Sequence, residues 1–239
     1  MTHNNYLIFF LGVSIFGLAV VMMSTFYPNI VADDPGLRKP LLGSLFVLAC
    51  LLGMGATAFP KSCFRIFSEG KNRKATDNKY KKSAGITPNF RGHHPNCGNF
   101  SHHVFRIGKR PICAGCLGLF IGGLVNLIGA FVYFFAGLRL ESSAVPISWI
   151  GAAGVSLGLL LPLFSIRWTL GRSAVNAFFA VGVFLVLVGV DSITRDINMG
   201  LLLILLTVFW IFTRISISQW SHQRICRRCQ LEKCGLRGF

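Results

Sequence analysis

Long apolar runs dominate the chain, separated by short polar connections and by one long basic segment. The hydrocarbon core of a bilayer is about 30 Å thick, so a helix of about 20 apolar residues can cross it. Because that core offers the backbone no water, each run predicts a spanning helix. Six spans are expected, at residues 6–27, 41–59, 112–135, 146–164, 174–190 and 197–213. The last two runs are close to the minimum of ~17 residues, so a re-entrant pair is the alternative there.

Composition leads to the same class of protein. Of the 239 residues, 53% are hydrophobic and only 13% are charged, which excludes an ordinary soluble domain. The expected fold class is therefore all-α, a polytopic membrane helix bundle that forms one domain over residues 1–239. A loop at 60–111 and a tail at 214–239 are its longest polar parts. Residues 1–5 contain no Lys or Arg and the first run is long, so the first run does not resemble a signal peptide.

The distribution of Lys and Arg predicts how the chain crosses the membrane, because cytoplasmic loops carry an excess of both. Assigning alternate loops to opposite sides places 20 of the 24 on the side that holds both termini. We therefore expect cytoplasmic N- and C-termini, in a prokaryotic inner membrane. The net charge of +16 lies next to the bilayer, which favours anionic lipid headgroups as partners. Nucleic-acid binding is not expected, since the basic segments adjoin spans.

Cysteines are concentrated on this cytoplasmic side, which holds seven of the eight. Four of them form two Cys-x-x-Cys pairs, Cys113 with Cys116 and Cys226 with Cys229. The cytoplasm keeps thiols reduced, so clustered cysteines there favour a metal over disulfides. Structural zinc takes four such soft ligands. The pattern predicts a zinc site that ties the start of the third span to the tail.

Several other residues could replace one of these four ligands. They are two further thiols and five histidines, Cys97, Cys234, His93, His94, His102, His103 and His222. An iron–sulfur cluster needs the same four thiolates and is the alternative cofactor. Two unconnected pairs of thiols, or a pair that exchanges disulfides, also stay open. Cys50, inside the second span, is expected to be a small packing residue.

Polar residues inside the spans are few. With the boundaries above, no span contains Asp, Glu, Lys or Arg, which disfavours an ion-coupled transporter. Asp191 and Asp196 are expected to be solvated in an outer loop, and Asn126, Asn176 and Asn198 to form interhelical hydrogen bonds. The Gly-x-x-x-Gly motifs at 118–122 and 154–158 predict that the third and fourth spans pack closely together.

The stretch from Cys97 to Gly123 resembles an uncharacterised prokaryotic membrane-protein family, domain of unknown function 2085. The matching residues, in order, are Cys97, Phe105, Gly108, Pro111, Cys113, Ala114, Cys116 and Gly118. The sequence departs from the family pattern at Gly98, His103, Val104 and Ser165. The resemblance implies a small polytopic membrane protein with a cytoplasmic cysteine cluster and no established activity. It also implies that its three cysteines need a fourth ligand, which the tail could donate.

These features favour a non-enzymatic function, because no nucleophile elbow, phosphate-binding loop or pair of catalytic carboxylates is present in the sequence. The leading hypothesis is an integral membrane accessory or interaction protein, a subunit of a larger membrane complex, stabilised by the metal. A membrane thiol or iron–sulfur redox protein is the second hypothesis. A small passive transporter or lipid-binding protein is the third.

Overall fold

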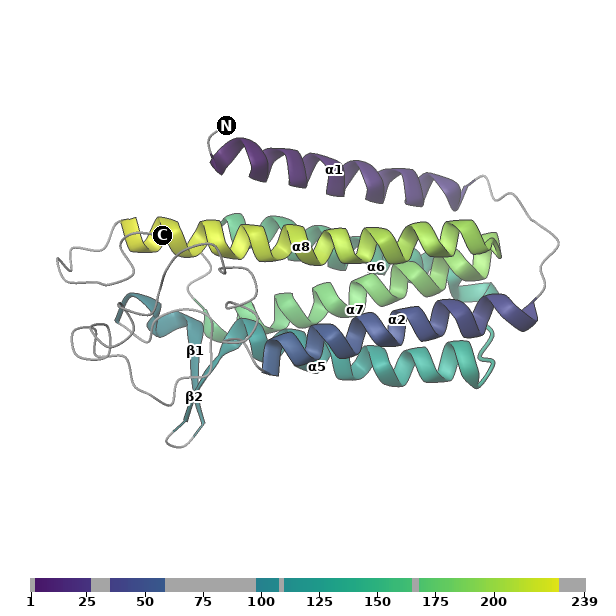
Figure 1. Cartoon of the computed structure of the whole chain (residues 1–239), viewed down its shortest axis with the longest axis horizontal. Coiled ribbons are helices and arrows are strands. Elements are labelled where there is room, and N and C mark those ends of the chain that lie inside the picture. Colours follow the sequence, from purple (N-terminus) through teal and green to yellow (C-terminus); the bar gives the residue numbers. More distant parts are fainter. Residues whose placement is uncertain (1–2, 27–34, 59–97, 108–109, 165–167, 228–239) are drawn as a thin grey trace, which may run out of the picture.

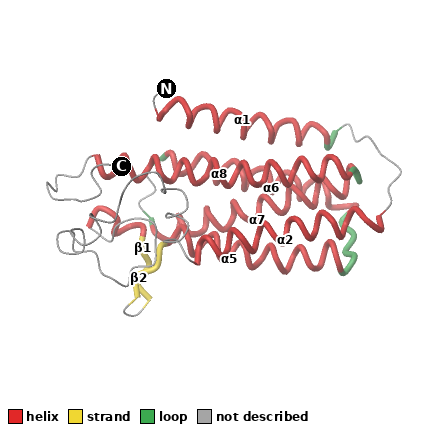
Figure 2. The backbone as a smooth tube through the Cα atoms, in the orientation of Figure 1, coloured by secondary structure: helices red, strands yellow, loops and turns green. Residues whose placement is uncertain are grey.

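The structure is a computed structural model of the chain, and it describes residues 3–26, 35–58, 98–107, 110–164 and 168–227. Within these ranges, six helices are long and apolar enough to cross a membrane. They are α1 (His3–Ser24), α2 (Pro35–Ala58), α5 (Ala114–Ala130), α6 (Ala144–Leu160), α7 (Thr169–Thr194) and α8 (Ile197–Arg227). Figures 1 and 2 show these helices side by side in one elongated bundle. The expected all-α membrane bundle with six spans is confirmed.

The short elements lie at the ends of the long helices. A π-helical turn, η2 (Phe131–Phe135), extends α5, and a 3-10 turn, η4 (Leu161–Leu163), extends α6. Another 3-10 turn, η3 (Glu141–Ser143), leads into α6. Part of the expected loop at 60–111 forms η1 (Gly98–His103), β1 (Val104–Ile107) and the start of β2 (Arg110–Cys113). The two strands form an antiparallel hairpin that pairs Val104 with Cys113 and leads directly into α5.

The last two helices are longer than the apolar runs that predicted them. With a rise of about 1.5 Å per residue, the 26 residues of α7 span about 39 Å and the 31 residues of α8 about 46 Å. By length, both can cross the bilayer completely, so the re-entrant alternative does not describe them. The predicted boundaries were too short because they stopped at charged residues, whereas α7 includes Arg172 and Asp191 and α8 includes Arg214.

Helix α7 is the most enclosed of the six spans, and both glycine motifs pack against it. A Cβ at Gly118 of α5 would lie 2.1 Å from the carbonyl oxygen of Ser173, and one at Gly154 of α6 would lie 3.0 Å from the Cα of Gly182. The prediction that the third and fourth spans pack on each other was therefore wrong. Each packs on α7 instead, because small residues on both faces of α7 let the two backbones approach it from opposite sides.

Helices α1 and α8, at opposite ends of the sequence, lie side by side (Figure 1). Ser14 and Thr213 share a buried hydrogen bond of 3.0 Å, and the indole Nε1 of Trp210 donates to the carbonyl oxygen of Ser14 at 3.2 Å. The beginning of α1, the end of α8 and the hairpin lie at the same end of the bundle (Figure 1). We call this the hairpin end.

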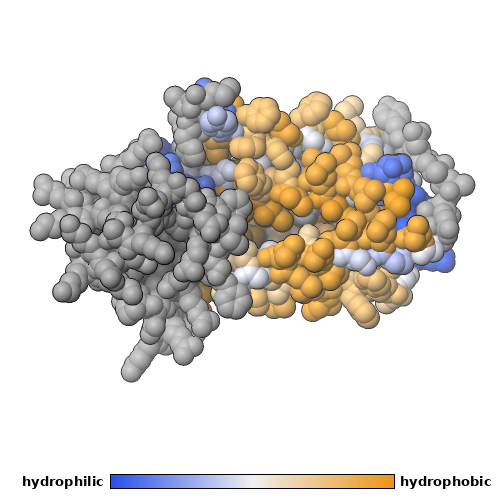
Figure 3. Space-filling model, in the orientation of Figure 1, coloured by the Kyte–Doolittle hydropathy of each residue, from blue (hydrophilic) through white to orange (hydrophobic). Residues whose placement is uncertain are grey.

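On the face of the bundle seen in Figure 3, the described part of the surface is mostly apolar. Large hydrophobic side chains point outward from several helices, among them Phe16, Leu52, Ile128 and Leu205. A surface of this kind is stable against lipid rather than water. The chain is therefore an integral membrane protein whose spans contact lipid.

Candidate functional site at the hairpin end

Cys113 and Cys116 lie where the hairpin turns into a spanning helix. Cys113 is the last residue of β2 and the N-cap of α5, with extended backbone angles of φ −66° and ψ 124°. Cys116 follows inside the first turn of the helix, so both thiols face the same end of the bundle, as predicted. Their side chains form a hydrogen bond with each other, and both are thiols rather than half-cystines. Cys113 is only 3% exposed.

Two guanidinium groups, one from α7 and one from α8, lie within electrostatic range of this pair. Arg172 and Arg214 both interact electrostatically with Cys113, and they also act on each other as like charges. The Nη2 of Arg214 donates to the Oδ1 of Asn176 at 2.7 Å, and the Nδ2 of Asn176 donates to the carbonyl oxygen of Arg172 at 2.7 Å. The first of these bonds fixes the guanidinium of Arg214, whereas the second joins Asn176 to the backbone of Arg172.

The surroundings of the pair are positive. The Nε of Arg214 is buried, and among the described residues it has no hydrogen-bond partner. The acidic side chains that the structure describes, Asp191 and Asp196, belong to the C-terminal end of α7 and the turn after it, at the opposite end of the bundle. The N-termini of α5 and α7, which carry partial positive charge, lie beside the cluster. Such a field favours a thiolate at Cys113, the thiol with which both arginines interact.

Two of the predicted histidines join the cluster through aromatic packing. The rings of His103, His222 and Phe100 form a triangle with centroid separations of 5.1 to 5.6 Å. Nη1 of Arg172 lies 3.4 Å from Nδ1 of His103, which is buried. His102 is exposed, and its carbonyl oxygen accepts a hydrogen bond from Thr169. Because His222 belongs to α8 and His103 to η1, these contacts join the end of α8 to the segment that precedes the hairpin.

The complete ligand set of the predicted zinc site stays a prediction. Cys226 lies in the last turn of α8, at the hairpin end, but its side chain is outside the described part of the structure. The remaining candidates, Cys97, Cys229, Cys234, His93 and His94, also lie outside it. Among the described side chains, no group of three or more His, Cys, Asp or Glu residues is placed to hold a metal ion. Cys113 and Cys116 thus form at most half of a tetrahedral site by themselves.

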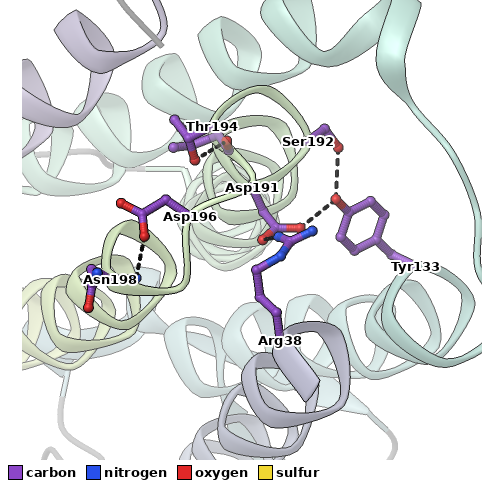
Figure 4. A network of polar contacts seen from close by, with 8 residues as sticks. Arg38, Tyr133, Asp191, Ser192, Thr194, Asp196 and Asn198 are labelled. Carbon is purple, nitrogen blue, oxygen red and sulfur yellow. Dashed lines mark hydrogen bonds and ion pairs between the residues drawn. The ribbon is translucent and has the colours of Figure 1, made fainter. Parts of the chain in front are cut away.

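A second polar cluster, at the opposite end, was missed by the sequence analysis (Figure 4). Asp191 is not solvated in a loop, as was predicted; it is 1% exposed, and its carboxylate forms a buried ion pair with Arg38 of α2. The hydroxyl of Tyr133 donates to Oδ2 of Asp191 at 2.7 Å and lies 2.8 Å from Oγ of Ser192. The sequence did contain one indication of this pair. Arg38 lies just before the second predicted span and Asp191 directly follows the fifth, so the two opposite charges lie on the same predicted side of the membrane.

The other polar residues of the spans fall into two groups. Asn126 joins α5 to α7 by donating to the carbonyl oxygen of Ala180 at 2.8 Å, and Asn176 joins α7 to α8 through Arg214, both as expected. Cys50 of α2 lies close to Asn126, whose Oδ1 is buried and has no hydrogen-bond partner among the described residues. Asn198 behaves differently, because its side chain is exposed and its backbone N–H bonds to Oδ1 of Asp196 at 2.9 Å.

Comparison with known proteins adds no family to this description. No protein-family model, curated protein or solved structure shows significant similarity to the chain. The class is defined by the fold alone: an integral membrane protein of six apolar helices with a thiol–guanidinium cluster at one end.

Proposed function

We propose that the protein is a non-enzymatic membrane accessory or interaction protein whose hairpin end is stabilised by a cysteine-ligated metal, zinc in the first place. Cys113 and Cys116 would supply two ligands, and Cys226 and Cys229 the other two. The observation that carries the proposal is the position of Arg172 and Arg214 beside Cys113. Positive charge favours the thiolate forms that a metal needs, and a shared thiol–thiol hydrogen bond already brings the two sulfur atoms together.

The path of α8 supports a contribution from the tail. The helix passes the thiol pair at Arg214 and then contacts η1 through His222, one turn before Cys226. A metal held by ligands from both segments would connect the end of the last span to the start of α5. Such a connection stabilises the folded state, because the ligands of a structural site come together only when the chain is folded.

The biological setting follows from charge and surface. We propose that the hairpin end is cytoplasmic, which agrees with the excess of Lys and Arg on that side and with a reducing environment for the thiols. Other membrane subunits and anionic headgroups are the proposed partners, and a prokaryotic inner membrane is the proposed location. The resemblance to domain of unknown function 2085 supports the same assignment through its cysteine motif.

Metal analysis of the full chain, purified in detergent or nanodiscs without chelator, tests the proposal. We expect about one zinc per chain, lost together with thermal stability in Cys113→Ser, Cys116→Ser, Cys226→Ser and Cys229→Ser. Cys50→Ser is the matched control, because it removes a thiol from the middle of the bundle, and it should keep the metal. A protein that stays metal-free after exposure to zinc, yet is folded, would contradict the proposal.

A thiol or iron–sulfur redox protein is the second candidate, and the direct hydrogen bond between Cys113 and Cys116 is the observation that favours it. An iron–sulfur cluster would give visible absorption and stoichiometric iron and sulfide, whereas zinc gives none of these. Fast alkylation of both thiols in the metal-free native protein, with reversible formation of one disulfide, would indicate thiol chemistry. Slow alkylation that accelerates only after chelation would favour the metal.

A further inference from the structure

We propose that a groove between α2 and the last turns of α5 binds an acyl chain of an anionic phospholipid, with the lipid phosphate paired to Lys39. The groove has a volume of about 370 Å³, which lies in the usual range of ligand pockets. Its lining includes Ser44, Leu48 and Leu51 of α2 and Leu127, Phe131 and Phe135 of α5 and η2. None of the candidate metal ligands contributes to this lining, so the lipid site does not depend on the proposed function.

The groove is built into the packing of two neighbouring helices (Figure 1). Helices α2 and α5 run in opposite directions and approach each other closely at two levels. A Cβ at Gly43 would lie 2.6 Å from the Cβ of Phe134, and a Cβ at Gly123 would lie 2.7 Å from the Cγ of Met54. The leucines of the lining fall between these two levels. The position of the groove is therefore fixed by contacts of the folded bundle.

The π-helical turn η2 forms one wall of the groove. The N–H of Ala136 donates to the carbonyl oxygen of Phe131, five residues back, at 3.0 Å. Tyr133 and Phe134 of this turn are buried in the bundle. Phe131 and Phe135 are exposed instead, and their rings stack with centroids 6.1 Å apart. Single π-helical turns occur frequently at functional sites, and here the turn places two stacked rings on the surface that faces lipid.

An acyl chain suits this lining better than another helix does. Membrane helices pack through small residues, which let the two backbones approach. The edges of the groove carry four large and exposed side chains, Leu48, Leu51, Phe131 and Phe135. A helix at least about 10 Å wide is too bulky to enter between them. A flexible chain of methylene groups can follow these side chains and gain dispersion contacts along the groove.

Lys39 supplies a cation for the phosphate. Its Nζ lies 4.6 Å from the centre of the Tyr133 ring, so the ammonium is beside η2. The neutral ring does not compensate this charge, and Asp191, the carboxylate bonded to Tyr133, is already paired with Arg38. A lipid with a net negative charge therefore gains more at this position than a zwitterionic lipid, whose own ammonium offsets its phosphate.

The spacing between Lys39 and the groove fits one leaflet of a bilayer. At a rise of about 1.5 Å per residue, Ser44 lies about 8 Å and Leu51 about 18 Å from Lys39 along α2. The hydrocarbon of one leaflet is about 15 Å deep. A phosphate at the level of Lys39 therefore leaves its acyl chain at the level of the groove. The exposed hydroxyl of Ser44, at the near end, can donate to an ester oxygen between the two.

Photolabelling of the full chain in nanodiscs tests the site. The probes are a phosphatidylglycerol and a phosphatidylcholine with the same diazirine-containing acyl chain, and mass spectrometry of the labelled peptides locates each product. We expect phosphatidylglycerol to label Leu48 and Leu51 roughly fivefold more than phosphatidylcholine does, the factor given by one Lys near an anionic headgroup. Phe16 of α1 and Leu205 of α8 are at least as exposed and lie outside the groove lining, so both lipids should label them alike.

Two results of this experiment would overturn the lipid site. One is an equal ratio of the two lipids in the groove and at Phe16 and Leu205, because the groove would then behave like any lipid-facing surface. The other is protection of the groove from both lipids, because another protein segment would then cover it.

Two pairs of variants separate the headgroup from the acyl chain. Lys39→Gln should remove the preference for phosphatidylglycerol while both lipids still label the groove, and Arg106→Gln, at an exposed cation of the hairpin, should keep the preference. Ser44→Phe should fill the groove and reduce its labelling by both lipids, whereas Ser44→Ala should leave the labelling largely intact. A folded Lys39→Gln protein that keeps the preference would contradict the pairing with phosphate. A folded Ser44→Phe protein with unchanged labelling would contradict the position of the acyl chain.

Discussion

Arg38 of α2 forms a buried ion pair with Asp191 of α7, although 153 residues separate them in sequence. The carboxylate also accepts a hydrogen bond from Tyr133, whose π-helical turn continues α5. Three helices are therefore joined by one network at the end opposite the hairpin (Figure 4). An additional cation, Lys39, lies 4.6 Å from the centre of the Tyr133 ring.

Removing one member of this ion pair should destabilise the bundle strongly. Asp191→Ala leaves Arg38 buried without its counter-charge, and such changes cost about 3–5 kcal/mol. Replacing both residues by Leu should cost clearly less than the sum of the single changes, because no unpaired charge remains. Reversible unfolding in mixed micelles measures the difference. Asp196→Ala, which affects a half-exposed carboxylate, is the control and should change the free energy of unfolding by less than about 0.5 kcal/mol.

The hydroxyl of Tyr133 should contribute less than the ion pair but measurably. Tyr133→Phe keeps the ring that packs in the core and removes the bond to Asp191, so we expect a loss of about 1–3 kcal/mol. The same unfolding experiment reports it. Tyr6→Phe on the exposed face of α1 serves as the matched control. Equal stability of the two variants would show that the network does not depend on this hydroxyl.

The closest helix contact should be intolerant of a single methyl group. Gly118→Ala would place a Cβ 2.1 Å from a backbone oxygen of α7. The two helices would have to separate to make room for it, so we expect destabilisation of about 1–3 kcal/mol or more. Gly53→Ala meets no atom within 4 Å and should be neutral or slightly stabilising. Comparing their unfolding transitions tests the packing of α5 on α7. A Gly118→Ala protein as stable as the Gly53→Ala protein would contradict it.

The orientation in the membrane can be measured with fused reporters. We expect a fluorescent reporter after residue 239 to be active in the cytoplasm, because 20 of 24 Lys and Arg flank that side. A phosphatase that requires export, fused after residue 139, should be active, because that connection lies at the opposite end of the bundle from the hairpin. The reverse pattern of activities would place the thiol cluster outside the cytoplasm. The cytoplasm would then no longer keep these cysteines reduced, and a metal would no longer be favoured over disulfides.

The two polar clusters were predictable to different degrees. Cys113 and Cys116 stand three positions apart at the start of an apolar run, so helical geometry alone places them together, and the structure agrees. The arginines within electrostatic range of them come from α7 and α8, and no local pattern in the sequence connects Arg172 to Arg214. Asp191 was misassigned because a carboxylate at the end of an apolar run has the same sequence signal whether it is solvated or paired.

The amino-acid sequence by itself determined the class of this protein and the number of its spans. Both follow from the requirement that backbone polar groups in lipid be satisfied within each helix, which is a local property. Tertiary structure alone decided which helices became neighbours: α5 and α6 lie on α7 rather than on each other, and Arg38 lies beside Asp191. Those contacts depend on how closely two backbones can approach and on which buried charges compensate each other. Both are relations between distant segments, so the order of residues along a single helix cannot predict them.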